Sequence, residues 1–408
     1  MQYNMQLQHY KKGKFMNTLL DRALLLKDEI IDNRRALHGY AEIEFDIPQT
    51  KALVMSKLKE YGLDPQPVGK AGVVCTIGKE GGKTFLLRAD MDALPIPEKT
   101  GLPFAAINGN SHSCGHDCHT SMLLGAAKLL KDMEDSLDGC VKLMFQPAEE
   151  ILGGAKDMIE NGVLESPKVD VAAAMHIMTG IDAAQSGCVY FKPSSLTVSA
   201  DAIRVEVKGL EAHGSTPYLG VDAIQIAAEI TIALQNIVTK ELPAKEYGLV
   251  LVGKISGGTA VNIVADNAVL DITVRGSTNE IRSKLKQRVK EISEGIAKLY
   301  GGEAVVDFLY GMPPLVNDDV LCADLEKYCI DLLGAENVKP MPGFNGSEDF
   351  AMVAEAVPSV LFTFGVGSLE EGHEHYLHHA CLKVNEDVLH IGSAVYAQCA
   401  AEWLKSHA

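Results

Sequence analysis

Residues 111–130 read SHSCGHDCHTSMLLGAAKLL, a dense group of histidine, cysteine and aspartate followed by an apolar run. The apolar side chains recur at the spacing of one helix face, and Asp117, Thr120 and Ser121 can cap the start of a helix. We therefore predict a loop that leads into a buried helix. A helix packed in a core holds the preceding loop still, and such a loop can bind a metal ion.

Cys114 and His116 stand two residues apart in that loop. If the segment is extended, both side chains leave on the same face, where a thiolate and an imidazole can bind one ion. For an isolated C-x-H pair, the alternative is an ordinary cysteine in a polar loop. The six His, Cys and Asp residues within residues 112–119 favour the metal site.

Length and composition limit the class of protein. A chain of 408 residues exceeds the size at which one hydrophobic core usually stops growing, so we expect two domains. A net charge of −17 argues against nucleic acid as a partner, because a phosphate backbone requires a basic surface. Nine cysteines without paired spacing fit a reducing compartment, which predicts a cytoplasmic protein.

The first fifteen residues contain no apolar segment long enough for a signal peptide, and no later run is long enough to span a membrane. We therefore expect no membrane partner. A clear helical pattern begins at Met16. Two interpretations of residues 1–16 remain open, a disordered extension and a misplaced start of the chain.

Short apolar strands alternate with helices between about residues 73 and 175. This alternation predicts an α/β domain with a mostly parallel sheet and helices on both faces. In such sheets, ligands bind beyond the carboxyl ends of the strands. The candidate chemical residues stand at those ends: Asp90, Asp92, Glu149, Glu150 and His176.

The order of elements changes from about residue 200 to residue 308, where it reads strand, helix, strand, strand, helix, strand. This is the order of the split βαβ, ferredoxin-like unit. We assign residues 199–309 to an inserted α+β domain. Residues 17–198 and 310–408 then form a discontinuous catalytic domain that binds the metal.

Glu149 and Glu150 are neighbours at the end of an apolar strand. Adjacent side chains usually diverge, so one glutamate can bind metal while the other faces a water molecule, as metal-assisted hydrolysis requires. The alternative is a solvated pair that opens a helix and interacts favourably with its dipole. An isolated EE pair does not decide between these interpretations.

Histidines supply the other candidates. His176 ends an apolar strand, where a buried structural histidine is the alternative to a ligand. Residues 373–381, HEHYLHHAC, contain His378 and His379 among four histidines and could be a surface metal trap. The complete set of one thiolate, three imidazoles and at least two carboxylates is sufficient for two metal ions bridged by water.

Eight segments of the chain resemble those of one enzyme family. In chain order they are RRALHGYAEIEFD, LLRADMDALPI, HSCGHDCHTSMLLGAA, FQPAEEILGGAKDMIENGVL, AMHI, EAHGSTPYLGVDAI, GGTAVNIVAD and GFNGSEDFAMVAEAVPSVLFTFG. They resemble the amidohydrolase branch of the aminoacylase and carboxypeptidase-type metallopeptidases, which contains N-acyl-amino-acid amidohydrolases, hippurate hydrolases and plant auxin-conjugate hydrolases. The resemblance runs from about Asn17 to the end of the chain.

This resemblance implies a set of metal ligands and a general base. Five residues match the family's ligands: Cys114, His116, Glu150, His176 and His378. Glu149 matches the general base. His378 is preferred to His379 because it stands four residues before Leu382, where the family pattern has its ligand before an aromatic residue.

Other positions resemble the groups that orient the metal site and bind the substrate. Asp92 resembles the carboxylate that orients the ligands. His213, in the segment AHGSTP, resembles the histidine of the inserted domain that polarises the scissile carbonyl; a turn histidine is the alternative. Asn262 and Arg275 resemble groups near the substrate carboxylate, although Arg275 could equally be structural.

Three departures from the family pattern concern residues near the site. The segments LHHAC and NIVAD each lack a proline that the family usually has, and Leu382 replaces an aromatic residue. None of these departures removes a ligand. We therefore expect the chemistry to be retained and the substrate preference to be affected.

We predict a metal-dependent hydrolase that cleaves N-acyl amino acids, which are small molecules, with two divalent ions. Zn²⁺ or Mn²⁺ fits the ligands, with Co²⁺ or Ni²⁺ as alternatives. A dipeptidase or carboxypeptidase on the same scaffold is the alternative function. A non-catalytic binding protein is a more distant one, since it would be expected to have lost a ligand or Glu149. The outer sheet edge of the inserted lid domain predicts a homodimer.

Overall fold

The computed structural model describes residues 18–79, 81–341 and 346–408, so the extension predicted at residues 1–16 lies outside the described residues. The chain divides into two compact units. The first unit comprises the chain up to Lys192, together with Asp318–Met341 and Val357–Ala408. The described part of the second unit comprises Pro193–Asn317 and residues 346–356. The second unit therefore interrupts the first in the sequence.

The first unit is built on an eight-stranded sheet with a parallel centre. In spatial order the strands are β1 (Gln66–Val68), β2 (Gly72–Gly78), β4 (Gly139–Gln146), β3 (Lys83–Asp90), β5 (Val171–Met178), β16 (Ser359–Gly365), β6 (Val189–Phe191) and β15 (Val338–Pro340). Neighbours from β4 to β16 are parallel, and so are β6 and β15. The pairs β1–β2, β2–β4 and β6–β16 are antiparallel. The predicted α/β class with a mostly parallel central sheet is confirmed.

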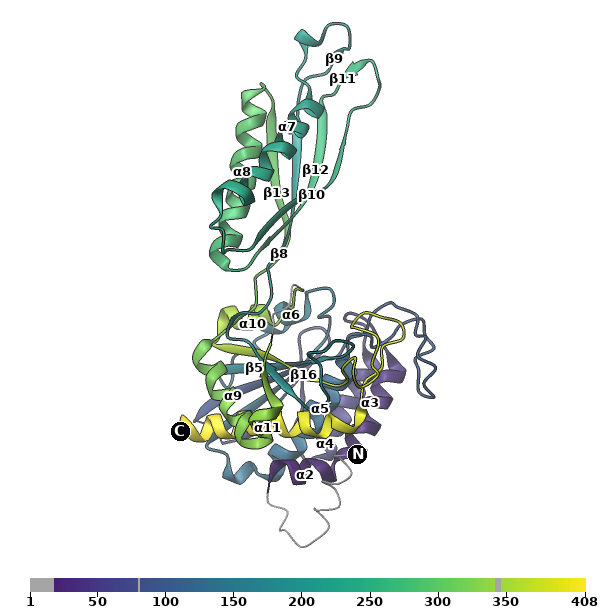
Figure 1. The fold of residues 1–408 in the computed structure, drawn as a ribbon, viewed down its shortest axis with the longest axis vertical. Helices are drawn as coiled ribbons and strands as arrows, with labels where there is room; N and C mark the ends of the chain where they lie inside the picture. Colours follow the sequence, from purple (N-terminus) through teal and green to yellow (C-terminus); the bar gives the residue numbers. More distant parts are fainter. Residues whose placement is uncertain (1–17, 80, 342–345) are drawn as a thin grey trace. The chain divides into compact units, whose positions relative to one another are not determined.

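Helices cover this sheet because its central strands are apolar on both faces. Phe85, Leu86 and Leu87 of β3 are consecutive and fully buried, a pattern typical of a strand covered on both sides. The covering helices are α4 (Pro48–Glu60), α5 (His116–Asp132), α6 (Gly154–Glu160), α9 (Asp319–Leu333) and α11 (Leu389–Ser406) (Figure 1). Two further helices, α2 (Leu19–Leu25) and α3 (Lys27–Tyr40), pack on α5 and α11. Short 3₁₀ turns lie at Glu134–Ser136, Ala335–Asn337 and Glu386–Val388.

The buried helix predicted from residues 111–130 is α5, which packs against α3 and α11. Gly125 permits this close packing. A Cβ atom at this position would lie 2.4 Å from Ser393 Oγ of α11 and 2.8 Å from Ile30 Cδ1 of α3. Because the interior is close-packed, a larger side chain here would force the helices apart.

The start of α5 differs from the prediction. The helix begins at His116, directly after Gly115 with φ of 88°, and no side chain caps it. The predicted cap at Asp117, Thr120 or Ser121 is wrong because Asp117 has tertiary partners. Its Oδ2 lies 2.7 Å from Arg34 Nε and 2.7 Å from His38 Nδ1.

The second unit has a four-stranded antiparallel sheet in the order β10 (Gly248–Gly257), β12 (Asn267–Gly276), β8 (Ala200–Lys208) and β13 (Glu303–Met312). Two helices pack on one face, α7 (Ala223–Asn236) and α8 (Asn279–Leu299). The chain order of these elements is the split βαβ order predicted from the sequence. Figure 1 shows both helices along the sheet.

Small elements complete the second unit. Two short antiparallel pairs form, β7 (Ser194–Ser195) with β14 (Val316–Asn317), and β9 (Ala212–His213) with β11 (Ile263–Val264). Helical turns lie at Pro217–Leu219, Ile237–Glu241 and α10 (Ala351–Ala356). These pieces carry His213 and the segment that precedes β11.

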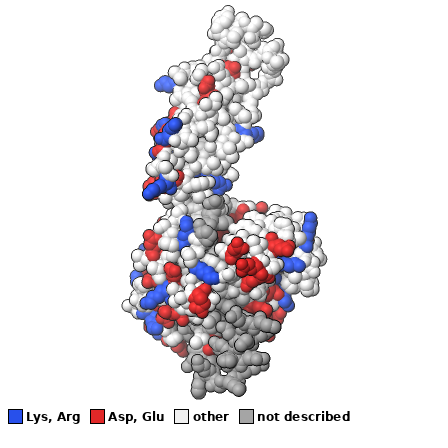
Figure 2. Space-filling model, viewed as in Figure 1, with Lys and Arg blue, Asp and Glu red and all other residues white. Residues whose placement is uncertain are grey.

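The surface of the first unit is acidic on the face seen in Figure 2, where Asp and Glu side chains gather with Lys and Arg scattered among them. The chain as a whole contains 54 acidic and 37 basic residues. Among the described residues, no helix combines the length and the hydropathy needed to cross a membrane.

His390 is buried in the first turn of α11, and its Nδ1 atom has no hydrogen-bond partner among the described residues. Burial lowers the pKa of His390 from 6.5 to about 4, and the charge of Lys27 acts in the same direction. The folded protein therefore keeps the ring neutral at pH values where the unfolded chain already binds a proton. It follows that stability decreases as the pH falls from 6.5 towards 4.

Replacing the titrating ring should reduce this acid sensitivity. The proton taken up by the unfolded chain destabilises the native state by about 2 kcal/mol at pH 5 and by little at pH 7. We expect His390→Leu to lose about 2 kcal/mol less unfolding free energy than the unaltered protein between these pH values, measured by urea unfolding. His407→Leu, at the exposed end of the same helix, is the control. Equal losses in His390→Leu and the unaltered protein would contradict the assignment.

Candidate metal centre

The carboxyl edge of the parallel strands gathers the candidate residues of the first unit. Asp90 ends β3, Glu149 and Glu150 follow β4, and His176 lies near the end of β5. Cys114 comes from the connection between β3 and α5, His116 is the first residue of α5, and His378 comes from the segment after β16. The structure thus brings together residues far apart in the chain, such as Cys114 and His378, which are separated by 264 positions.

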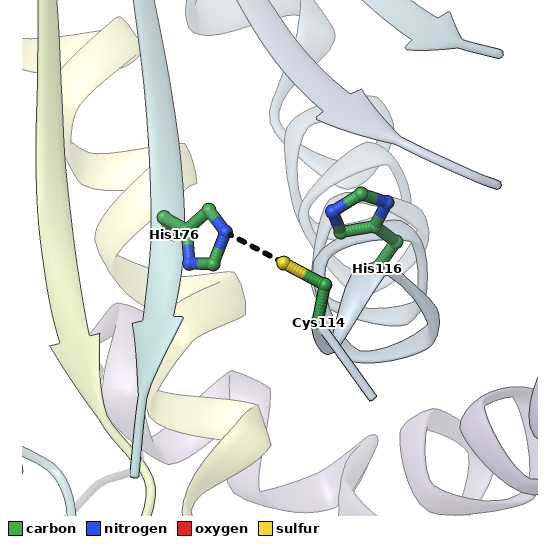
Figure 3. Close-up of side chains that lie close together, drawn as sticks. All are labelled: Cys114, His116 and His176. Atoms are coloured by element: carbon green, nitrogen blue, oxygen red, sulfur yellow. Dashed lines mark hydrogen bonds between the residues drawn. The ribbon is translucent and has the colours of Figure 1, made fainter. Parts of the chain in front are cut away.

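Cys114 lies at the centre of the first group of donors. Its Sγ atom is 3.5 Å from His176 Nε2 and 3.3 Å from His378 Nε2. His176 donates its Nδ1–H to the Ile177 carbonyl at 2.7 Å, which puts the Nε2 lone pair on the side of Cys114. Figure 3 shows the His176 ring directed at the sulfur, with His116 on the other side of Cys114.

Glu150 lies between His116 and His378. Its Oε1 lies 3.8 Å from His116 Nε2, and its Oε2 lies 3.6 Å from His378 Nε2. Burial raises the pKa of Glu150 to about 6, and the opposing effect of His116 is smaller. A nearby cation stabilises the ionised form of a carboxylate that is buried in this way.

These donors fit divalent metal ions. His116 Nε2 and Glu150 Oε1 are buried and have no hydrogen-bond partner among the described residues, a state that costs about 1–3 kcal/mol per atom. The donor atoms form overlapping groups whose members lie within 4.8 Å of one another. These groups are Cys114, His116, His176; Cys114, Glu150, His378; and His116, Glu149, Glu150. Thiolate, imidazole and carboxylate are donors that Zn²⁺ accepts.

Asp92 helps to orient His116, Glu149 and Glu150. Its Oδ1 accepts the backbone N–H of Glu149, and its Oδ2 accepts that of Glu150, both at 3.1 Å. Oδ1 also lies 3.3 Å from His116 Nδ1. If that nitrogen donates, the His116 Nε2 lone pair faces Glu150, so one carboxylate directs both the imidazole and the Glu pair.

Glu149 is a buried side chain with 6% of its surface exposed, and α6 begins only at Gly154. The alternative of a solvated pair opening a helix is therefore wrong. The chain turns after β4 at Ala148, whose φ of 55° is uncommon for a residue other than glycine. Such conformations carry strain of the order of 1 kcal/mol and cluster at functional sites.

Asp90 is fully buried beside His116, and its Oδ2 lies 3.6 Å from His116 Nε2. Arg88 Nη1 donates to its Oδ2 at 2.7 Å, and His119 Nδ1 donates to its Oδ1 at 2.5 Å. Burial alone raises the pKa of Asp90, but the charge of Arg88 and the hydrogen bond that His119 donates outweigh burial and hold the pKa well below its ordinary range. Asp90 is therefore ionised.

The sequence analysis missed the role of His119. Burial lowers the pKa of His119 to about 3, so the ring is neutral, and its Nε2 accepts the N–H of Ile177 at 2.8 Å. Since the Ile177 carbonyl holds His176, His119 positions that ligand candidate through the backbone of one residue, Ile177. The sequence did contain a pattern that indicates this position. His119 follows His116 by three residues on a helix, and residues at this spacing share a face.

His213, Asn262 and Arg275 belong to the second unit, and their predicted roles stay predictions. His213 is exposed in β9; its Nδ1 accepts the N–H of Ser215 at 3.1 Å and lies 2.7 Å from the Ser215 hydroxyl. The Asn262 carbonyl accepts the N–H of Gly214 at 2.7 Å, which brings these residues side by side. Arg275 donates to Ser347 Oγ at 3.2 Å.

Comparison with known proteins identifies the family. Residues 86–402 match the model of Peptidase family M20/M25/M40. The chain is 37% identical over 367 residues to N-acetyl-L-cysteine deacetylase of Bacillus subtilis (strain 168), covering 89% of this chain and 85% of that protein. It is 34% identical over 381 residues to IAA-amino acid hydrolase ILR1-like 6 of Arabidopsis thaliana, covering 91% and 79%.

The chain also resembles a solved structure described as a member of the M20 family. The Bacillus subtilis YXEP protein, described as a dinuclear metal binding peptidase from the M20 family, superimposes with a TM-score of 0.80 at 29% identity. The match covers 94% of this chain and 99% of that one. On the extent of the family match and the identity to these relatives, the chain belongs to Peptidase family M20/M25/M40 and is a hydrolase of amide bonds.

Proposed function

We propose that the protein is a metal-dependent amidohydrolase that cleaves N-acyl amino acids into a carboxylic acid and an amino acid. The observation that carries this proposal is the convergence of a thiolate, three imidazoles and Glu150 beside the buried Glu149. The names of two relatives, a deacetylase of N-acetyl-L-cysteine and a hydrolase of IAA-amino acids, support the substrate class.

Five residues would hold two divalent ions: Cys114, His116, Glu150, His176 and His378. The description of the YXEP protein as dinuclear supports the number of ions. The mixed donors suit Zn²⁺ or Mn²⁺ and would also accept Co²⁺ or Ni²⁺. When bound, such ions polarise the scissile carbonyl and lower the pKa of a water molecule.

Glu149 acts as the general base and then as the general acid. It removes a proton from the attacking water, the oxygen of that water forms a bond to the carbonyl carbon, and the C–N bond breaks. Glu149 then returns the proton to the leaving amine, so that the reaction consumes one water. Its position suits this role, because Asp92 anchors its backbone and its side chain lies beside His116 and Glu150.

Residues of the second unit would bind the substrate. His213 uses Nδ1 to accept the Ser215 N–H, so its Nε2–H is available to donate to the carbonyl oxygen as charge develops there. Arg275 and Asn262 would bind the carboxylate of the amino acid, for which a guanidinium is well suited. In this scheme the second unit acts as a lid.

A dipeptidase or carboxypeptidase is the alternative, favoured by the peptidase description of the family. The two functions differ in the group on the acyl side, which is neutral in an N-acyl amino acid and carries an ammonium in a dipeptide. We expect kcat/KM for N-acetyl, N-benzoyl or longer N-acyl amino acids to exceed that for matched dipeptides by at least about tenfold, which corresponds to about 1.4 kcal/mol. Faster turnover of the dipeptides would favour the alternative.

Changing each of the two adjacent glutamates to glutamine should have a different effect on metal content and on turnover. Glu149→Gln should keep its bound metal and lose turnover by about 10²- to 10⁴-fold, the typical contribution of a general acid or base. Glu150→Gln should lose metal affinity, because an amide oxygen is a weaker ligand than a carboxylate. Elemental analysis of the purified variants beside their rates measures both effects.

Glu160→Gln is the matched control, since Glu160 is exposed at the end of α6. It should change neither metal content nor rate. If Glu149→Gln empties the site while Glu150→Gln stays loaded, the two roles are reversed. If neither change affects rate or metal, the mechanism is wrong.

The protein should form a homodimer through β10. This strand is one edge of the second sheet, and its Leu251 and Ile255 are each 51% exposed. An exposed apolar edge strand readily pairs with another strand, and a two-fold axis would pair it with its own copy.

The cytoplasmic location predicted from the cysteines stays a prediction.

Light scattering at micromolar concentration should give twice the chain mass of 43.9 kDa. Leu251→Lys with Ile255→Lys should shift the protein towards monomer. Leu309→Lys, on the opposite edge strand β13, is the control and should leave the dimer intact. A monomeric unaltered protein would refute the dimer, and dissociation by the control alone would move the interface to β13.

A further inference from the structure

A second group of metal-binding side chains lies in the segment after β16. Donor atoms of His375, His379 and Cys381 lie within 4.8 Å of one another. The two imidazole rings are stacked, with centroids 4.1 Å apart and planes inclined by 14°. None of these three residues belongs to the set proposed to hold the catalytic ions, and Cys381 is a free thiol.

The backbone separates this group from the catalytic candidates. His378 has φ of 64°, in the left-handed region, and its Nε2 lies 3.3 Å from Cys114 Sγ. This turn allows His378 to face Cys114 while the next residue, His379, stacks on His375. Neighbouring residues in the sequence therefore serve two different groups.

The segment is anchored on both sides of the turn. His378 N–H donates to the Ser113 carbonyl at 2.7 Å, and the Ala380 carbonyl accepts the N–H of Lys99 at 2.8 Å. The His375 backbone packs so closely on Gly180 that a Cβ atom there would lie 2.4 Å from it. The donors are thus presented on a fixed backbone, which lowers the entropy cost of binding an ion.

We propose that His375, His379 and Cys381 bind one further divalent ion of borderline softness, with Zn²⁺ as the best match. Two imidazoles and a thiolate are preferred ligands of such ions, and three protein ligands leave a fourth position for water. Hard ions such as Mg²⁺ or Ca²⁺ require oxygen ligands, which this set lacks. The site is separate from the catalytic centre and does not depend on its occupancy.

Binding exchanges weak contacts for metal–ligand bonds. His379 Nδ1 accepts the N–H of Cys381 at 3.1 Å, and Cys381 Sγ lies 3.6 Å from the Lys99 carbonyl. A sulfur–carbonyl contact is weak, and the imidazole must give up or redirect its bond to the N–H. An ion therefore requires small movements of side chains on a backbone that is already fixed.

Counting bound zinc tests the site. Tag-free protein stripped with a chelator is dialysed against about 10 μM Zn²⁺, and the zinc bound per chain is measured by mass spectrometry. We expect Cys381→Ser and His375→Gln each to bind one ion fewer than the unaltered protein. Glu374→Gln, at an exposed position of the same segment, should bind as many as the unaltered protein. Equal zinc in all four proteins would overturn the proposal.

Cobalt separates this site from the catalytic centre. In the Cys114→Ser protein, the catalytic centre lacks its thiolate, so thiolate-to-cobalt absorption should come from Cys381 and disappear when Cys381→Ser is added. Failure of the proposed amidase function would leave this result unchanged. Absorption that is missing in Cys114→Ser, or that persists in the double variant, would overturn the assignment of Cys381 as a ligand.

Discussion

The metal centre depends on one buried carboxylate, Asp90 at the end of β3. A buried charge is tolerated only when it is paired and hydrogen-bonded, and Arg88 and His119 meet that requirement at 2.7 and 2.5 Å. The bond to Asp90 fixes which nitrogen of His119 carries the proton, so the other nitrogen accepts the N–H of Ile177. The carbonyl of that residue then orients His176. One charge on β3 thus directs a side chain on the neighbouring strand β5.

Asp92 orients other ligand candidates, as Asp90 orients His176 through His119. Its two oxygens hold the backbone of Glu149 and Glu150 and lie beside His116, so the Glu pair and the imidazole share one support. Both glutamates lie among the potential donors, and the proposed mechanism assigns metal binding to Glu150 and proton transfer to Glu149, as hydrolysis by an activated water requires. The protein thus holds the donors in place before an ion binds, and His116 Nε2 and Glu150 Oε1 have no hydrogen-bond partner in the part of the chain that the structure describes.

Sequence reasoning found the features that depend on local pattern. Alternating apolar segments identified the parallel sheet, and the rule that ligands bind at the carboxyl ends of strands led to Asp90, Asp92 and the Glu pair. It failed where a distant partner decides the structure. Asp117 does not cap α5 because Arg34 and His38 bind it from α3. The role of His119 was missed because its partner Ile177 lies 58 residues away, which no periodicity encodes.

The central claim is that the carboxyl edge of the sheet holds two ions with a predefined set of side chains. Anomalous diffraction at the zinc absorption edge, from crystals grown with Zn²⁺, tests this claim most directly. The account predicts two peaks whose protein ligands, at about 2.0–2.3 Å, are drawn from Cys114, His116, Glu150, His176 and His378. Zinc bound elsewhere in the protein, with no peak within bonding distance of these five side chains, would contradict it.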